Sequence, residues 1–321
     1  MSLLGRLQPL IAKRRASPPA PTVPITADRY ELVVVSYHSK DHVAGLLEAA
    51  APDQRIVVVD NASGADGVAD VVRRFEHGRY LDGRDSGFAV AANLGAFSST
   101  ADYVIFANPD SRPTSSIWQA LVAELEADPL LASVAASTTE ADGRIEMGVG
   151  GWEPTVLRCL VYSLGLHTLL PHAGVYARPQ VGERVELGWL TGACMAVRRA
   201  TFVELGGFDE RYFVYNEDMA FGRRVREAGL RQKLRTDLLV RHSTGGSGGG
   251  STKMPQQRGA SMAAYLHHHN RAPAAVAMRL ILALGILARA AAAHLQHRRD
   301  LVARHLAYVR GLATSRSPFR P

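Results

Sequence analysis

The chain has 321 residues, of which 47% are hydrophobic and 21% are charged, so it can bury the core of one large domain or two ordinary ones. Its two cysteines, Cys159 and Cys194, exclude a disulfide framework and fit a reducing compartment. The net charge of +7 arises in residues 271–321, which hold nine arginines and one aspartate, whereas the rest of the chain is close to neutral. This distribution argues against a nucleic-acid partner and predicts a basic tail that faces an anionic surface.

The first 28 residues are expected to form a flexible lead-in that is basic and rich in proline. A short apolar patch comes before Lys13-Arg14-Arg15, and a proline-rich stretch follows at 17–24. A secretory signal peptide has the charged residues first and the apolar run after them. We therefore expect the folded domain to begin at residue 29.

From residue 31 onward, apolar runs alternate with segments of helical spacing. Runs at 31–37 and 55–63 read as buried strands, and segments 42–50 and 67–76 read as helices. This alternation predicts an α/β fold with a Rossmann-like, mostly parallel central sheet flanked by helices. Such sheets bind ligands at the carboxyl ends of their strands, which is where Asp60 and Asp110 are expected.

The stretch YVIFANPDSRP, at 103–113, ends an apolar run abruptly at Asn108-Pro109-Asp110. Asparagine, proline, aspartate and serine all favour turns, so a simple turn explains this stretch taken alone. The alternative is that the turn presents Asp110 to a metal ion.

Two helix starts leave similar alternatives open. Gly87 opens a helix rich in small residues, which could be packed in the core or could turn its N-terminus toward an anionic ligand. Asn216 is a good helix cap, followed by Glu217 and Asp218 in the first turn. These acids either stabilise the helix electrostatically or include a general base.

Taken in order, six short motifs resemble an inverting family 2 glycosyltransferase of the GT-A fold, closest to the bacterial rhamnosyltransferase-type members. The resemblance covers roughly 33–242. The motifs are VVVSYHS at 33–39, VVVDNAS at 57–63, DSGFAVAAN at 85–93, FANPDS at 106–111, TGACMAVRR at 191–199 and GGFDERYFVYNED at 206–218.

The resemblance implies a pocket for a nucleotide-sugar donor. Asp60 would hold the base or ribose, and Asp85 stands where the family usually has asparagine. The remaining residues implied in donor binding are Ser36, Tyr37, Gly87, Phe88, Asn108, Gly192 and Ala193.

The resemblance also implies a metal and a base. Asp110 would bind Mg²⁺ or Mn²⁺ bridging the donor diphosphate, and His242 would supply a further metal or diphosphate contact. A hard cation held by carboxylate oxygen offsets the charge of the leaving diphosphate. Asp218 matches the catalytic base, with Glu217 as its close rival. Together with the other motifs, this favours the metal interpretation of Asp110 over a simple turn.

Beyond a domain spanning 29–255, we expect a basic helical extension at 256–321. Its segment at 274–313 reads as one long helix. Arg279 and Arg289 interrupt the apolar centre of this helix, so the uninterrupted apolar run is too short to span a membrane. The helix is better suited to lie on the surface of an anionic membrane. Alternatively, it packs on the domain or forms a homodimer. The glycine-rich segment 245–251 could close over the bound diphosphate, or it could be only a connector between the domain and the extension.

These expectations combine into an inverting, divalent-metal-dependent glycosyltransferase, with rhamnose from dTDP-rhamnose as the favoured sugar. The acceptor is expected to be a hydroxyl of a polyprenyl-linked or other cell-envelope glycan, and the location cytoplasmic, peripheral at the inner face of the cell membrane. The alternatives are an acceptor that is a soluble secondary metabolite, and a non-catalytic scaffold that binds nucleotide sugars.

Overall fold

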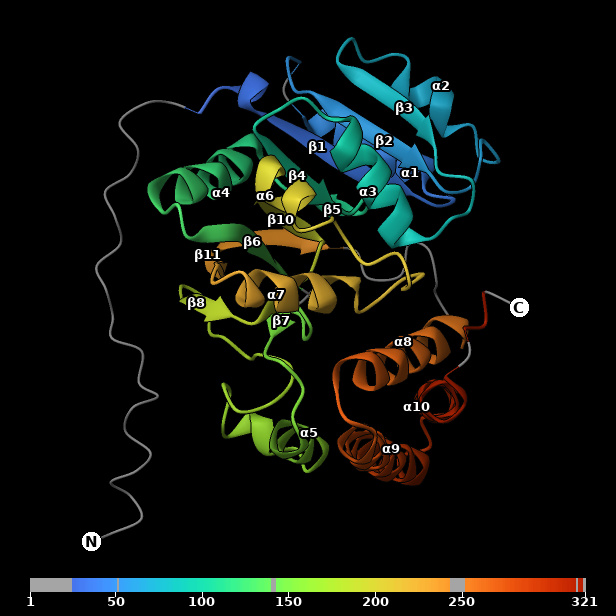
Figure 1. Cartoon of the computed structure of the whole chain (residues 1–321). Helices are drawn as coiled ribbons and strands as arrows, with labels where there is room; N and C mark the ends of the chain where they lie inside the picture. The colour runs from blue at the N-terminus through green and yellow to red at the C-terminus, as the bar shows by residue number, and fades with distance from the viewer. Residues whose placement is uncertain (1–24, 51, 140–142, 243–251, 316, 320–321) are drawn as a thin grey trace, which may run out of the picture.

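The structure is a computed structural model that describes residues 25–321 except 51, 140–142, 243–251, 316 and 320–321. Four parallel strands in the order β3-β2-β1-β4 form the first half of its main sheet (Figure 1). Alternate side chains of a strand face opposite sides of a sheet, so Leu32 and Val34 enter one core and Val33 enters the other. These strands are β1 (Tyr30–Ser36), β2 (Ile56–Asp60), β3 (Gly78–Asp82) and β4 (Tyr103–Ala107).

The second half of the sheet mixes strand directions. β10 lies antiparallel between β4 and β6, β11 runs parallel to β6, and the short β5 and β8 pair with β11. A separate pair, β7 and β9, is antiparallel. The strands are β5 (Ser111–Arg112), β6 (Leu131–Thr139), β7 (Gly150–Gly151), β8 (Arg184–Leu187), β9 (Trp189–Leu190), β10 (Cys194–Arg198) and β11 (Arg231–His242).

Helices cover both faces of the sheet, as the alternating pattern predicted. One core contains side chains of α1, α2 and α4, and the other contains side chains of α3, α6 and α7. The expected α/β class is therefore confirmed. These helices are α1 (Lys40–Ala49), α2 (Val68–Val72), α3 (Phe88–Ser98), α4 (Ser115–Ala127), α6 (Arg199–Glu204) and α7 (Glu217–Glu227), with a 3₁₀ turn at Ala27–Arg29.

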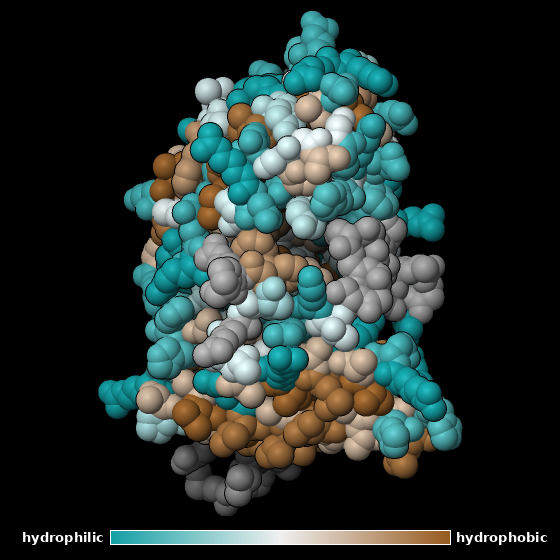
Figure 2. All heavy atoms as spheres, turned by 90° about the vertical axis from the view of Figure 1, so that its right-hand side faces the viewer, coloured by the Kyte–Doolittle hydropathy of each residue, from teal (hydrophilic) through white to brown (hydrophobic). Residues whose placement is uncertain are grey.

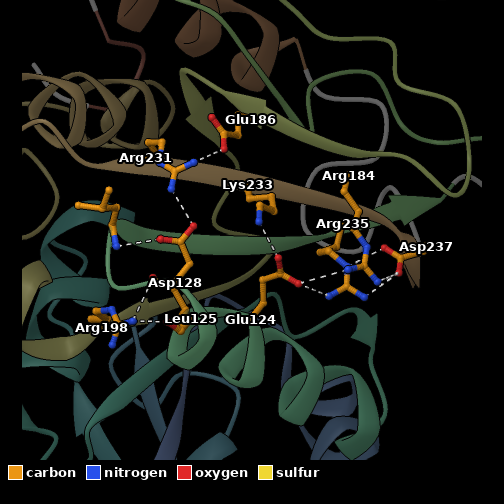
Figure 3. A network of polar contacts seen from close by, with 11 residues as sticks. Glu124, Leu125, Asp128, Arg184, Glu186, Arg198, Arg231, Lys233, Arg235 and Asp237 are labelled. Carbon is orange, nitrogen blue, oxygen red and sulfur yellow. Dashed lines mark hydrogen bonds and ion pairs between the residues drawn. The ribbon is translucent and has the colours of Figure 1, made fainter. Parts of the chain in front are cut away.

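A charged network ties α4 to the later strands (Figure 3). Glu124 of α4 is buried and receives Lys233 Nζ at 2.6 Å and Arg235 Nη1 at 2.8 Å, both from β11. Arg235 also pairs with Asp237 at 2.6 Å. Because each buried charge has an opposite partner, the network can sit inside the fold without an uncompensated ion.

Four helices lie at the end of the molecule opposite β1, β2 and β3 (Figure 1). A third core joins α8, α9 and α10 to α7, so the C-terminal helices pack on the domain. The expected single long helix at 274–313 is wrong: it breaks at 296–298, where His297 adopts a left-handed conformation with φ of 57°. The helices are α5 (Val156–Ser163), α8 (Lys253–His269), α9 (Ala272–Leu295) and α10 (Arg299–Thr314), with a 3₁₀ turn at Leu166–Thr168.

Candidate active site

The carboxyl ends of the first strands bring together side chains that the sequence placed in one pocket. Ser36 of β1 pairs in register with Asp60 of β2, which pairs with Asp82 of β3. Ser36 Oγ shares a hydrogen bond of 2.9 Å with Ser39 Oγ, and Tyr37 follows with its ring exposed. This edge is the expected ligand-binding edge of the sheet.

Asp60 is fully buried and orders the loop that follows it. Its carboxylate accepts the N–H of Ala62 at 2.9 Å, the N–H of Gly64 at 2.6 Å and the hydroxyl of Tyr80 at 3.1 Å. Burial, and next the charge of Asp60, raise the pKa of Tyr80 to about 12, so Tyr80 remains a donor. Asp60 thus orders the loop after β2, and its direct contact with a nucleotide stays a prediction.

Asp82 is an acid at the same edge that the sequence reading missed. It is exposed, and its Oδ1 accepts Ser63 Oγ at 2.9 Å and the N–H of Arg84 at 2.9 Å. The signal was weak because β3 has no β-branched run to mark it as a strand. Asp85, which was predicted, lies exposed in the next turn with φ of 50°.

The turn after β4 presents Asp110 as the sequence suggested. Both the N–H and the hydroxyl of Ser111 donate to the carbonyl of Asn108, at 3.1 and 2.6 Å. Asp110 is partly exposed at the tip. β5 begins at Ser111, whose backbone lies opposite His242 in β11, although the side chain of His242 is outside the described part of the chain.

The donor set at this turn fits a divalent cation that is shared with a diphosphate. Within the described residues, no group of three His, Cys, Asp or Glu side chains could hold a metal alone. Mg²⁺ is usually held by one or two carboxylates, with substrate phosphates and water completing the shell. Asp110 provides one such carboxylate, so the residues fit a metal that arrives with its phosphate ligand.

Backbone contacts connect this turn to the start of α3. The N–H of Asn108 donates to the carbonyl of Ala193 at 2.9 Å. Beside it, a Cβ on Gly192 would come within 3.4 Å of the ring of Phe88. The predicted donor residues on β4, β10 and α3 are therefore neighbours.

The small residues of α3 serve packing, which answers one of the open alternatives. The side chains of Ala89, Ala91, Ala92 and Ala96 are buried, and a Cβ on Gly95 would come within 2.5 Å of Val33. The first N–H of the helix is used within the protein, since Phe88 donates to the carbonyl of Phe213 at 2.7 Å.

Gly87 and Asn93 fix the loop that leads to α7. Gly87 has φ of 94°, and a Cβ there would lie 2.5 Å from the carbonyl oxygen of Phe213. The buried amide of Asn93 donates to the carbonyl of Phe208 at 2.9 Å and accepts its N–H at 2.7 Å. The loop that precedes the predicted base is thus held against the start of α3.

The start of α7 differs from the expected cap. Tyr215 and Asn216 both have left-handed backbones, with φ of 69° and 70°. The amide of Asn216 makes no capping hydrogen bond and lies 3.5 Å from the sulfur of Met219. Asn216 therefore takes the expected N-cap position, but its side chain packs against sulfur in the interior and does not cap the helix.

Glu217 and Asp218 occupy different environments. Glu217 is buried, and its Oε2 has no hydrogen-bond partner among the described residues. Burial, and next the charge of Asp218, hold the pKa of Glu217 well above its usual value. Asp218 is partly exposed and accepts the N–H of Met219 at 2.7 Å. Burial raises the pKa of Asp218 to about 6. The hydrogen bond from Met219 and the charge of Arg258 favour the carboxylate and partly oppose this rise.

Arg258 of α8 is a second residue that sequence reasoning missed. Its guanidinium lies 4.6 Å from the ring centre of Tyr215, and its charge acts on Asp218 and on Tyr176. No local motif marks it, because it belongs to a helix assigned to the C-terminal extension. The fold alone brings this cation to the start of α7.

Comparisons with known sequences agree with this geometry. The model of glycosyl transferase family 2 matches residues 31–154, and that of glycosyl transferase family 21 matches residues 165–309. The N-acetylglucosaminyl-diphospho-decaprenol L-rhamnosyltransferase of Mycobacterium tuberculosis is 30% identical in an alignment over 231 residues, and the match covers 63% of this chain and 72% of that protein. Rhamnosyltransferase WbbL of Escherichia coli K12 is 24% identical over 212 residues, covering 62% of this chain and 78% of that protein.

Solved structures share the fold. A mannosyltransferase from Pyrobaculum calidifontis, in complex with GDP-Man and Mn²⁺, has a TM-score of 0.58 at 17% identity, covering 92% of this chain and 90% of that chain. GalNAc-T7, solved with UDP, GalNAc and Mn²⁺, has a TM-score of 0.52 at 14% identity and covers 75% of this chain and 48% of that chain. These matches confirm the expected glycosyltransferase fold.

Proposed function

The chain belongs to glycosyltransferase family 2, and we therefore propose that it transfers L-rhamnose from dTDP-rhamnose to a hydroxyl of a polyprenyl-diphosphate-linked sugar, with inversion at the anomeric carbon. The geometric observation that carries the catalytic part is the partly exposed carboxylate of Asp218, which follows the buried Glu217 at the start of α7 and is influenced by the charge of Arg258. The rhamnosyl donor and the lipid-linked acceptor are supported by the names of two relatives.

Asp218 is the proposed general base. A base must be ionised before the reaction, and a pKa of about 6 leaves Asp218 ionised at neutral pH while it can still accept a proton. It takes the proton of the acceptor hydroxyl while that oxygen bonds to the anomeric carbon. The bond from this carbon to the diphosphate breaks on the opposite face, and the nucleoside diphosphate leaves with the electron pair. Glu217 is buried in the first turn of α7, and burial holds its pKa well above the usual value, so it is less suited to act as the base.

Asp110 is the proposed ligand of a divalent cation, Mg²⁺ or Mn²⁺, with Asn108 beside it and His242 opposite Ser111 in the sheet register. When bound, such a cation neutralises charge on the donor diphosphate. The two structural neighbours were solved with Mn²⁺, which supports a divalent ion.

The proposed donor pocket is the edge from β3 to β10. Asp60 orders its rim, while Ser36, Tyr37 and Asp85 line the side where the nucleotide would lie. Gly87 and Phe88 follow at the start of α3, and Gly192 and Ala193 form the floor next to Asn108. A substrate that is membrane-linked would place the enzyme at the inner face of the cell membrane.

Release of nucleoside diphosphate from a donor panel tests this proposal. The panel contains dTDP-rhamnose, several UDP-sugars and GDP-mannose, each with a lipid-linked acceptor and with Mg²⁺, Mn²⁺ or EDTA. We expect release from dTDP-rhamnose alone, and we expect EDTA or Asp110→Asn to abolish it. Release from a UDP-sugar would show that this sugar nucleotide, and not dTDP-rhamnose, is the donor. Release that is unaffected by EDTA and by Asp110→Asn would overturn the metal assignment.

A further inference from the structure

One face of α9 is exposed and apolar along the whole helix. Val276, Leu280, Leu284 and Leu287 follow the three- and four-residue spacing of a single helix face, and Leu280 and Leu284 are 59% and 66% exposed. From 272 to 292, where every residue is described, the exposed positions of α9 carry no charge. Figure 2 shows apolar side chains gathered in a band at this end of the molecule.

The two arginines within α9 turn away from this face. Arg279 donates to the backbone carbonyls of Leu312 and Ala313 at the end of α10, at 2.5 and 3.0 Å. Arg289 donates to the carbonyl of Tyr162 at 2.5 Å, with its guanidinium 4.6 Å from the ring centre of that tyrosine. The charges that interrupt the apolar sequence are therefore used inside the protein.

α5 and the segment after it extend the apolar surface. Leu157 and Leu164 are 70% and 68% exposed, and Leu169, just past the 3₁₀ turn, is 79% exposed. The two helices touch closely, since Ser163 Oγ donates to the carbonyl of Ile281 at 3.0 Å. Figure 1 shows α5 and α9 side by side at the same end of the molecule. We call the exposed apolar residues of 156–170 and 272–295 the α5–α9 face.

Charge around this face selects its partner. The sequence contains no Asp or Glu at 154–182 or at 271–299. Arg271 precedes α9, and Arg298 and Arg299 follow it, all three exposed. An apolar helix face with basic ends is complementary to a bilayer whose headgroups are anionic, because the arginines meet the headgroups while the leucines enter the acyl boundary. A water-facing surface would not need this pattern.

We propose that the α5–α9 face docks in the plane of an anionic lipid bilayer. This inference rests on the proposed lipid-linked acceptor. The expectation that the apolar segment is too short to span a membrane is wrong by length and composition, because α9 is long and apolar enough to cross one. However, its inward face is packed in the third core, and Arg279 and Arg289 are bonded to other elements, so crossing would require α9 to leave the fold.

Docking would bring the proposed base near the membrane. The ring of Tyr162, on which Arg289 rests, lies 5.1 Å from the ring of Tyr176. The ring of Tyr176 lies 5.8 Å from the ring of Trp189, which shares the third core with Met219, the residue after the proposed base. A short series of packed aromatic side chains thus connects α9 to the start of α7, which suits an acceptor whose lipid stays in the bilayer.

Vesicle flotation of the full chain tests the proposal. We expect the wild type to float with vesicles that contain phosphatidylglycerol. With vesicles of pure phosphatidylcholine, the protein should not float. Leu280→Glu combined with Leu284→Glu should weaken flotation by about tenfold or more, and so should Leu157→Glu combined with Leu164→Glu. Leu130→Glu is the matched control, because Leu130 is 52% exposed between α4 and β6, away from α5 and α9 (Figure 1), and it should float like the wild type.

A second readout separates this inference from the enzymatic one. Binding of the nucleotide-sugar donor in solution should be unchanged in the leucine variants, so their loss of flotation would not reflect a lost fold or a lost active site. Equal flotation of wild type and leucine variants would overturn the proposal. The proposal would also be overturned if the wild type did not bind anionic vesicles but formed a dimer that the Leu284→Glu change dissociates. Resistance of the membrane-bound protein to extraction by alkaline carbonate would instead show that α9 spans the bilayer.

Discussion

Glu217 and Asp218 are adjacent in the sequence, yet only Asp218 reaches solvent at the start of α7. The sequence could place both acids in the first turn of a helix. At this position an acid is expected whether it stabilises the helix or acts as a base, so the sequence alone does not distinguish the two roles. What it could not give is the burial of Glu217 and the approach of Arg258, because both depend on α8 packing against the loop before α7. Their contrast in pKa follows from the tertiary structure.

Substituting each acid by its amide should separate their roles. Asp218→Asn removes the proposed base, and we expect transfer to fall about 10²–10⁴-fold. Glu217→Gln keeps a buried side chain of nearly the same shape, and burial already disfavours the charged form of Glu217, so activity should stay within about tenfold of the wild type. Steady-state transfer rates check both. The opposite ranking would make Glu217 the base.

The pH profile should report Asp218. Its carboxylate must be ionised to accept a proton, so kcat/KM should be constant above pH 6–7 and fall about tenfold per unit below about pH 6. Arg258→Leu removes a charge that favours the ionised form, so the midpoint should move to higher pH. Arg304→Leu, an exposed change on α10, is the control. An unshifted midpoint in Arg258→Leu would show that Arg258 does not act on the base.

At the scale of elements, the first half of the sheet was predictable because β1, β2 and β4 are continuous apolar runs. β3 escaped notice because GRYLD carries no such run. The single helix expected at 274–313 failed because no proline or glycine marks the break, which depends on His297 adopting a left-handed backbone. Local patterns therefore predicted strands that are buried on both faces and missed features set by tertiary packing.

The contact between α5 and α9 can be tested at Gly285. A Cβ there would lie 2.5 Å from the Cβ of Ser163, so Gly285→Ala should destabilise the fold by about 1–3 kcal/mol. This outweighs the gain of about 0.8–1.0 kcal/mol in helix propensity. In Gly45→Ala, within α1, the nearest obstacle is the flexible end of Arg112, and the propensity gain should dominate. Denaturant unfolding of both variants measures the difference, and a stabilised Gly285→Ala would contradict the close packing.

At the scale of the whole molecule, the charge network of Figure 3 ties α4 to β8 and β11 in the second half of the sheet. Glu124→Gln would leave Lys233 and Arg235 facing a neutral amide, so we expect a loss of about 3–5 kcal/mol in the free energy of unfolding. Asp70→Asn breaks the exposed pair with Arg73 and should cost less than about 1 kcal/mol. Similar losses in the two variants would mean that burial adds nothing to this network.

The arrangement of the whole chain also shows where sequence reasoning stops. The basic charge of residues 271–321 was visible from composition, as was their apolar helix. That Arg279 and Arg289 face inward, and that α5 continues the same apolar face, needed the packed structure. The C-terminal helices therefore pack on the glycosyltransferase domain, since α8 carries Arg258 and shares a core with α7.

Transfer of rhamnose to a lipid-linked acceptor tests the central claim most directly. The measurement follows radiolabelled rhamnose from dTDP-rhamnose into a polyprenyl-diphosphate-linked N-acetylglucosamine, with wild type and Asp218→Asn side by side and donor binding checked for both. The account predicts labelled lipid with the wild type and a loss of about 10²–10⁴-fold in the variant, with donor binding retained. A variant that transfers as fast as the wild type, or a wild type that binds the donor but never labels this lipid, would contradict it.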